Sequence, residues 1–223
     1  MDNKNTNNSI EYFGASVRGP SNKSKKKLKE DAWLGVKRSW GYLIVACDGM
    51  GSKENAREGA KEACHAVRDA IQLWQAYEAP IEFLFKTIHL NWEYRIHPLD
   101  PNDCATTCLF AYLNNENEIT IAQLGDGVCV IRDKDGNINL LDGDESGFTN
   151  TTTGLGIAKS IKNWRYSSLK TFAPGSAVLL ATDGVSEDVE KNRLGDMTYD
   201  IVSEYRGMSP RKRWETLCYE LRN

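Results

Sequence analysis

Residues 44–52 read IVACDGMGS, and this stretch decides how the rest of the chain is interpreted. Its four apolar residues predict a buried strand. The strand runs into a carboxylate, Asp48, and two glycines follow it within three positions. Because glycine has no side chain, it lets the backbone approach a ligand or another segment closely. A carboxylate at the mouth of such a strand is a candidate binding group, and a partner for it is expected elsewhere in the chain.

The pattern of apolar strand, aspartate and glycine recurs further along the sequence. The stretch AVLLATDGVS (177–186) ends its apolar run at Asp183, and ITIAQLGDGV (119–128) carries Asp126 between two glycines. The pair Glu30-Asp31 precedes another short strand-like stretch. Taken singly, an Asp-Gly is most simply a turn, because Asp tolerates turn geometry and Gly supplies positive φ. The joint occurrence of these acids favours a shared site.

Carboxylates gathered in one place repel each other unless a cation neutralises them. Oxygen ligands without His or Cys favour Mg²⁺ or Mn²⁺ over Zn²⁺. The three histidines, His65, His89 and His97, lie on predicted helices and do not join these motifs, so they are expected to be structural or surface residues. The six cysteines are dispersed without C-x-x-C spacing, which favours reduced, buried thiols in a cytosolic protein over a disulfide framework.

Composition sets the outer bounds. A chain of 223 residues suits one large domain or two small ones. A net charge of −3 gives no global reason to expect nucleic acid or an anionic membrane as partner. No apolar run is long enough to span a bilayer, and the N-terminus is polar. We expect a cytoplasmic, monomeric protein that binds neither nucleic acid nor membrane.

The periodicity of apolar residues predicts strands early, two long helices, further strands and a helical tail. Because the later strands are joined by short turns, among them a hairpin at Asp135-Gly136, antiparallel sheets covered by helices are favoured over a parallel sheet. The predicted strands are 11–17, 32–36, 40–46, 106–113, 118–125, 128–141, 165–172 and 177–184, and the predicted helices are 55–74, 80–96, 197–205 and 209–221.

Together these motifs resemble the PP2C-type metal-dependent serine/threonine phosphatases, particularly the bacterial branch. The resemblance covers about residues 10–190. It implies an α+β fold, a four-layer α-β-β-α sandwich of two antiparallel sheets flanked by helices, as a single domain over residues 10–223 behind a flexible tail, 1–9. The matching stretches, in family order, are KED (29–31), VACDGMGS (45–52), ATT (105–107), AQLGDG (122–127), NTTTGLG (150–156) and LLATDGVSE (179–187).

The resemblance further implies that a dinuclear Mn²⁺ or Mg²⁺ centre activates a water, which hydrolyses phosphoserine and phosphothreonine in proteins. By position, Asp48 would bridge the two metals, the backbone carbonyl of Gly49 would bind one, and Asp183 would bind the second. Glu30 would hold metal-bound water, and Asp31 would lie behind the ligands. The substrate would be a phosphoprotein, as made by a serine/threonine kinase.

Three positions near the site complete or depart from the family pattern. Asp126 would orient water or a neighbouring loop. Met50 stands where many relatives carry a histidine that can protonate the leaving group, so water or another acid would serve here. Lys26 stands where the family has its phosphate-binding arginine, and Arg18 is a possible substitute. Lysine offers a point charge rather than a bidentate fork, so weaker phosphate binding is expected.

The end of the sequence departs most from the family. Relatives carry a last metal-binding aspartate in an Asp-Asp or Asp-Asn pair that enters a final strand, whereas this chain closes with CYELRN. We therefore expect the domain to lack its C-terminal strand and the sequence to be part of a longer reading frame. The second metal site should then be the weaker one, unless another acid such as Asp188 or Asp196 replaces the missing ligand.

Two alternatives remain open from the sequence. Cys47 with Lys53 mimics the Cys-x5-Arg phosphate loop of cysteine phosphatases, although Asp48 would repel an incoming phosphate. A catalytically impaired phosphatase-like binding module is the other alternative. Phosphoester hydrolysis with and without Mn²⁺ separates these possibilities.

Overall fold

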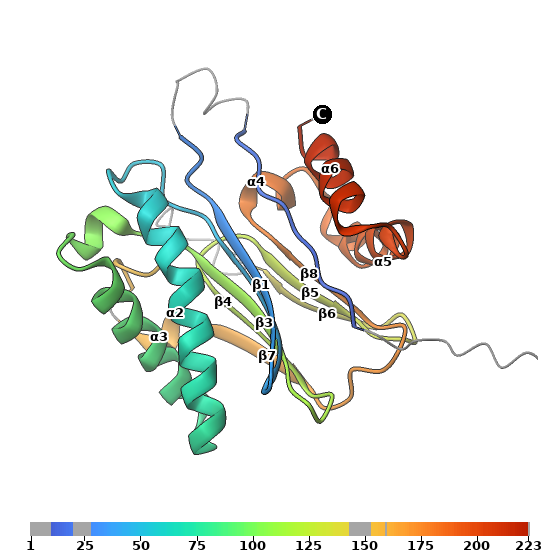
Figure 1. Cartoon of the computed structure of the whole chain (residues 1–223), viewed down its shortest axis with the longest axis horizontal. Coiled ribbons are helices and arrows are strands. Elements are labelled where there is room, and N and C mark those ends of the chain that lie inside the picture. The colour runs from blue at the N-terminus through green and yellow to red at the C-terminus, as the bar shows by residue number, and fades with distance from the viewer. Residues whose placement is uncertain (1–9, 20–27, 143–152, 159, 223) are drawn as a thin grey trace, which may run out of the picture.

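The structure, a computed structural model, describes residues 10–19, 28–142, 153–158 and 160–222. Two antiparallel sheets pack face to face, and helices cover the outer face of each sheet (Figure 1). The four-layer α-β-β-α architecture expected from the sequence is therefore confirmed. Within the described residues no helix combines the length and the apolar character that crossing a bilayer demands.

In the described residues the larger sheet has five strands and the smaller sheet has three. The larger sheet runs, in spatial order, β1 (Ala32–Arg38), β2 (Gly41–Cys47), β3 (Cys108–Leu113), β4 (Ile119–Leu124) and β7 (Arg165–Leu169). The smaller sheet runs β6 (Ile138–Asp142), β5 (Val128–Arg132) and β8 (Ala177–Ala181).

Strand β2 shows how the sequence pattern builds the larger sheet. Leu43, Val45 and Cys47 are buried under the helices, whereas Tyr42 and Ile44, on the opposite face, join the core between the sheets. This alternation follows from the two-residue period of a strand. It fixes the register with β3, in which Ala46 pairs with Leu109, and so it fixes where the strand ends at Asp48.

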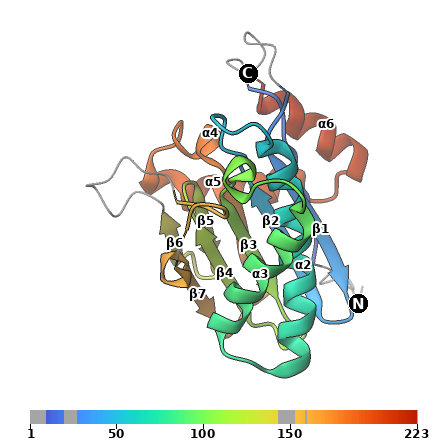
Figure 2. The same cartoon turned by 90° about the vertical axis from the view of Figure 1, so that its left-hand side faces the viewer.

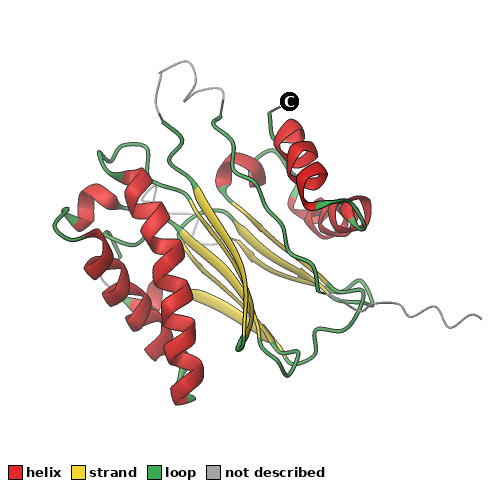
Figure 3. Ribbon diagram, in the orientation of Figure 1, coloured by secondary structure: helices red, strands yellow, loops and turns green. Residues whose placement is uncertain are grey.

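Helices α2 (Ala56–Tyr77) and α3 (Ile81–Ile96) cover the larger sheet (Figures 2 and 3). The buried stripe of α2 is built largely from alanine, which lets the helix lie close to the strands. Gly59 shows how close the packing is, because a Cβ there would lie 1.8 Å from the carbonyl oxygen of Cys104. The 3₁₀ helix η1 (Pro101–Cys104) thus lies against the first turns of α2.

The smaller sheet is covered by α5 (Leu194–Tyr205), α6 (Pro210–Glu220) lies on the same side of the molecule, and the single turn α4 (Asp183–Ser186) follows β8 (Figure 3). Leu194 of α5 packs into the same cluster as Val130 and Ala181 of the sheet. Both tail helices predicted from the sequence are present. The 3₁₀ turns η3 (Ile161–Asn163) and η4 (Lys191–Arg193) complete the set of elements in the described residues.

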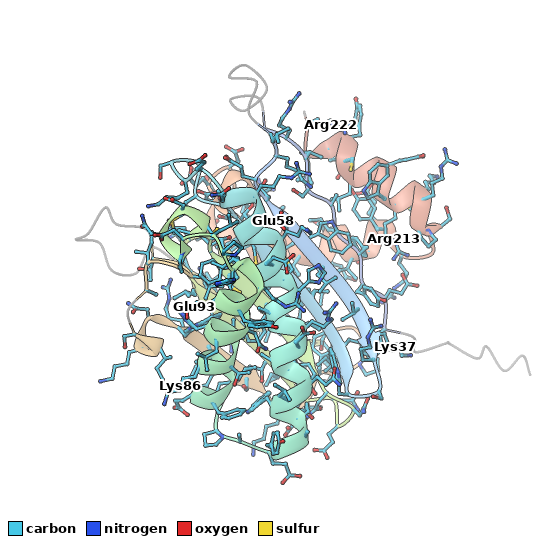
Figure 4. All side chains as sticks on the ribbon, turned by 60° about the vertical axis from the view of Figure 1, so that its left-hand side comes forward. Lys37, Glu58, Lys86, Glu93, Arg213 and Arg222 are labelled. Carbon is cyan, nitrogen blue, oxygen red and sulfur yellow. The ribbon has the colours of Figure 1, made fainter. Side chains whose placement is uncertain are left out.

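The strand predicted at 11–17 is wrong, because residues 10–19 have no regular secondary structure. The stretch instead runs between the larger sheet and the tail helices. The ring centroid of Phe13 lies 5.5 Å from that of Tyr205 on α5, and Arg213 of α6 (labelled in Figure 4) donates to Glu11 at 2.6 Å. Apolar alternation here reflects contacts on two sides rather than membership of a sheet.

Candidate active site

Asp48, the residue directly after β2, is held by the start of β3. Its backbone N–H donates to Thr107 Oγ1 at 2.9 Å. Its carbonyl oxygen accepts from the Thr107 N–H at 2.9 Å and from Thr106 Oγ1 at 2.8 Å. Both threonines are buried. Three hydrogen bonds therefore fix the backbone of Asp48, so its carboxylate stands on a rigid base.

Gly49 is wedged between two other backbone segments. A Cβ added to Gly49 would lie 2.6 Å from the carbonyl oxygen of Ala56 and 2.9 Å from that of Glu30. The next residue, Met50, donates its N–H to the carbonyl of Ala105 at 3.0 Å. The glycine is thus required by close packing, and it brings the backbone at Glu30 next to the end of β2.

The carboxyl group of Asp48 lies beside those of Asp31 and Asp183. Burial raises the pKa of Asp48 to about 10, with further contributions from a hydrogen bond and charge repulsion with Asp31 and then with Asp183. The motif before β1, which carries Asp31, and the motif after β8, which carries Asp183, therefore converge on Asp48 at the end of β2. Carboxyl groups that interact this strongly either share protons or need a cation between them.

Asp183 lies two residues after the end of β8, and the pairing of this strand fixes its position. It begins α4, and its Oδ1 accepts from the N–H of Gly184 at 2.6 Å. Strand β8 pairs with β5 so that Ala181 lies opposite Val128. Unlike Gly49, Gly184 has open space where a Cβ would stand. The two Asp-Gly pairs, alike in sequence, are therefore packed very differently.

Asp126 lies in the turn between β4 and β5, where Gly125 and Gly127 have φ of +94° and +102°. The buried side chain of Gln123 shapes this turn, because its Nε2 donates to the carbonyls of Gly125 at 3.0 Å and Gly127 at 2.7 Å. A Cβ on Gly127 would lie 2.6 Å from the carbonyl of Ala181. The Asp126 turn thus abuts the end of β8, two residues before Asp183.

The stretches ATT (105–107) and GLG (154–156) hold the backbone near Asp48 in place and contribute no acid to the site. Thr106 and Leu155 form an isolated antiparallel bridge, with N–H to carbonyl distances of 3.2 and 2.8 Å. A Cβ on Gly154 would lie 2.7 Å from Met50 Cε. The stretches ATT and GLG therefore clamp the loop that carries Asp48. Their threonines and Gln123 had no role assigned from the sequence, although the repeated motif order pointed to these stretches.

The phosphate-binding predictions stay predictions. Lys26 belongs to residues 20–27, which lie outside the described residues. Arg18 is described and lies two positions before that stretch. The first part of the NTTTGLG stretch, residues 150–152, also lies outside the described residues.

Cys47 does not have the properties of a nucleophile. Its side chain is fully buried, and its Sγ lies 3.8 Å from that of Cys64. Burial, followed by a hydrogen bond with Cys108, raises the pKa of the Cys47 thiol well above its ordinary value. A catalytic cysteine needs a lowered pKa and access to substrate, so the cysteine-phosphatase alternative is excluded.

The carboxylates fit a hard divalent cation by their chemistry, because they are oxygen donors and they crowd without a positive partner in the contacts described above. In the part of the chain that the structure describes, no group of three or more His, Cys, Asp or Glu side chains is arranged so that it could hold a metal ion as it stands. Asp31 and Asp183 meet Asp48 pairwise instead.

A family profile described as Protein phosphatase 2C matches residues 18–214 of the chain. The search of curated proteins found no match to the chain. Several solved structures share its fold. The photosystem II phosphatase PBCP has a TM-score of 0.63 and 14% identity, over 92% of this chain and 76% of that one. The serine/threonine phosphatase Stp1 from Staphylococcus aureus has a TM-score of 0.59 and 15% identity, over 87% and 84%. RsbX in complex with magnesium has a TM-score of 0.55 and 14% identity, over 86% and 79%.

Proposed function

The chain belongs to the protein phosphatase 2C family, and from that premise we propose that it hydrolyses phosphoserine and phosphothreonine esters of proteins with the aid of bound Mg²⁺ or Mn²⁺. The observation that carries the proposal is the convergence of Asp31 and Asp183 on the buried carboxyl of Asp48. Three motifs far apart in sequence deliver these acids to one point, which a purely structural role does not require.

The metal ligands proposed are the carboxylates of Asp48 and Asp183 and the carbonyl oxygen of Gly49, with Glu30 and Asp31 beside them. Support comes from the packing of Gly49, which leaves no room for a side chain and sets its backbone against that of Glu30. The relative RsbX was solved with magnesium. We propose two ions, as in the family resemblance, and a weaker affinity for the second.

Bound there, the cation supplies positive charge to the phosphoryl oxygens and lowers the pKa of the attacking water. The protein's own part is to hold and orient. Thr106 and Thr107 fix the backbone of Asp48 through three hydrogen bonds, so the carboxylate starts from a fixed main-chain position. We assign to Asp126, on its glycine-flanked turn beside β8, the role of orienting water.

Phosphate recognition is assigned to Lys26 or Arg18, whose cationic groups complement the dianionic ester. A histidine for leaving-group protonation is absent at Met50, whose side chain instead packs against Gly154. Solvent water is therefore the proposed proton donor to the serine or threonine alkoxide.

The experiment that tests the proposal measures phosphate release from a phosphothreonine peptide by protein stripped with EDTA and then supplied with Mn²⁺ or Mg²⁺. Activity that returns only with the metal supports the proposal. Absence of hydrolysis at any metal concentration favours the binding-module alternative.

A further inference from the structure

A cavity of about 450 Å³ lies at the end of the larger sheet opposite Asp48. It opens between the last turn of α2, the β1–β2 turn and the β3–β4 turn, which lie at the same lower end of the molecule in Figures 1 and 2. Trp40 and Asp48 stand at the two ends of β2, which has seven residues. At about 3.3 Å per residue the cavity is roughly 25 Å from the candidate active site.

Two indole rings form the apolar wall of the cavity. The ring centroids of Trp40 and Trp74 lie 5.7 and 6.1 Å from that of Tyr112, in edge-to-face arrangements. The Tyr112 hydroxyl donates to the carbonyl of Trp40 at 2.8 Å, and Trp74 Nε1 donates to the carbonyl of Ala79 at 2.5 Å. Tyr112 is buried, whereas both tryptophans are half-buried, so the indoles are fixed in place and still line the open space.

Three glutamates, Glu78, Glu116 and Glu118, line the same cavity. In the described residues none of the three takes part in an ion pair. Glu118 Oε2 accepts only a long hydrogen bond, 3.3 Å, from Asn114 Nδ2. Glu116 is near enough for its charge to raise the pKa of Tyr112, after the larger effect of burial.

The C-terminal end of α2 adds to the negative electrostatic potential that the three glutamates create in the cavity. This helix has 22 residues and no Lys, Arg or His in its last turn. Its C-terminal carbonyl groups therefore carry the negative end of the helix dipole without a cation near them on the helix. The cations nearest Trp40 in sequence are directed elsewhere, because Lys37 Nζ stands 5.0 Å from the ring centroid of Tyr42 and Arg38 Nη1 donates to the Lys37 carbonyl at 3.1 Å.

The carboxylates stand on fixed backbone. Asn114 Oδ1 accepts from the N–H groups of Glu116 at 2.9 Å and Glu118 at 2.8 Å, which sets the shape of the hairpin. Glu78 caps α2 in a left-handed conformation with φ of 48°. The backbone that carries these carboxylates is thus already ordered, so little backbone entropy would be lost when a ligand binds.

We propose that this cavity binds the guanidinium group of an arginine side chain presented by a partner protein. A planar cation stacks on indole faces and forms forked hydrogen bonds with carboxylates, and here both are present together. A protein is the favoured source because Tyr77, the residue before the lining residue Glu78, is a large apolar side chain that is 70% exposed. A partner that inserts an arginine would cover this side chain as well.

The test follows the indole N–H signals of Trp40 and Trp74 by NMR during titration with the acetylated, amidated peptide Gly-Arg-Gly. Trp40→Phe and Trp74→Phe assign the two signals. Saturable shifts of both signals are expected, with weaker binding of Gly-Lys-Gly and no saturation with Gly-Gln-Gly. Tetramethylammonium serves as a probe for a site that takes a free quaternary ammonium instead.

The double variant Glu116→Gln, Glu118→Gln should weaken binding of the arginine peptide at least tenfold, and Glu204→Gln, an exposed change on α5, should leave it unchanged. Tighter binding of tetramethylammonium than of the arginine peptide would overturn the assignment to arginine. Equal shifts with the glutamine peptide, or binding that the double variant leaves intact, would overturn the site itself. The readout does not depend on catalysis, so it is separate from the proposed function.

Discussion

Asp48 and Thr107 are joined twice, because the N–H of Asp48 donates to Thr107 Oγ1 at 2.9 Å and the N–H of Thr107 donates to the Asp48 carbonyl at 2.9 Å. The first acid of the site is thus held by a residue 59 positions away, at the start of another strand. The position of the carboxylate depends on strand pairing rather than on its own loop.

Thr107→Val should impair both stability and catalysis. The substitution keeps the shape of the side chain but leaves the Asp48 N–H without its acceptor, a loss of about 1–3 kcal/mol for a buried group. We expect a lower unfolding free energy and a reduced kcat, measured by urea denaturation and phosphopeptide hydrolysis. Thr87→Val, which removes a hydroxyl bonded to the Phe83 carbonyl within α3, is the control and should keep kcat unchanged. Equal activity of both variants would contradict the role of Thr107.

The two Asp-Gly pairs should respond differently to the same change. In Gly49→Ala the new Cβ meets backbone oxygens of Ala56 and Glu30 at 2.6 and 2.9 Å, so the segments must move apart. Overpacking of this kind costs about 1–3 kcal/mol and should also weaken metal affinity. Gly184→Ala meets nothing within 4 Å and should be tolerated. Thermal unfolding with and without Mn²⁺ measures both effects, and a tolerated Gly49→Ala would refute the packing argument.

Asp48→Asn should separate activity from stability. Removing the ionisable group should lower kcat by orders of magnitude, because asparagine cannot supply the negative charge that a cation needs. The metal-free protein should become more stable, because an amide, unlike a carboxylate, carries no charge to be buried or to repel Asp31 and Asp183. Cys47→Ser, the neighbouring change at a buried thiol, should retain most activity. Hydrolysis rates and the melting temperature in EDTA are the measurements. A metal-free Asp48→Asn protein that melts lower than the parent would count against the proposed crowding of acids.

The half-buried His89 should make stability depend on pH. Its Nε2 accepts from Trp164 Nε1 at 3.1 Å, and burial lowers the pKa of His89 from its ordinary value of 6.5. The unfolded chain therefore binds a proton more readily, so this contribution is present above pH 6.5 and is lost as the pH falls below it.

The variant His89→Gln keeps an acceptor for Trp164 but does not titrate, so its unfolding free energy should fall less between pH 7.5 and 5.5 than that of the parent. His97→Gln, at an exposed position, should behave like the parent. Parallel pH profiles of His89→Gln and the parent would show that His89 does not contribute.

Much of the fold follows from local pattern. The alternation in β2 and the alanine stripe of α2 each specify an element and the face that it buries. Which sheet a strand joins could not be predicted, because β7 and β8 follow one another in sequence and nothing local to either strand specifies its partner, yet β7 pairs with β4 and β8 with β5. The stretch 11–17 resembles a strand in sequence because contact with Tyr42 on one side and Tyr205 on the other imitates strand alternation.

The candidate site shows the same division. Asp48, Asp126 and Asp183 could be found because each follows an apolar run and lies beside glycine, and the pair Glu30-Asp31 because it lies next to a strand-like stretch. The groups that hold them could not, because Thr107 and Gln123 act through hydrogen bonds to backbone atoms that only the folded chain brings near. Residue type alone does not distinguish a threonine that supports a site from one that fills a sheet.

The most direct test of the central claim is the rate of phosphothreonine-peptide hydrolysis as a function of free Mn²⁺, after complete removal of metal with EDTA, for the parent and for Asp48→Asn. We predict no turnover in chelator, a hydrolysis rate that rises and saturates as Mn²⁺ is added to the parent, and little rise for Asp48→Asn at any Mn²⁺ concentration. Full turnover in chelator, or an equal rise in rate for the two proteins, would contradict metal-dependent hydrolysis at Asp48.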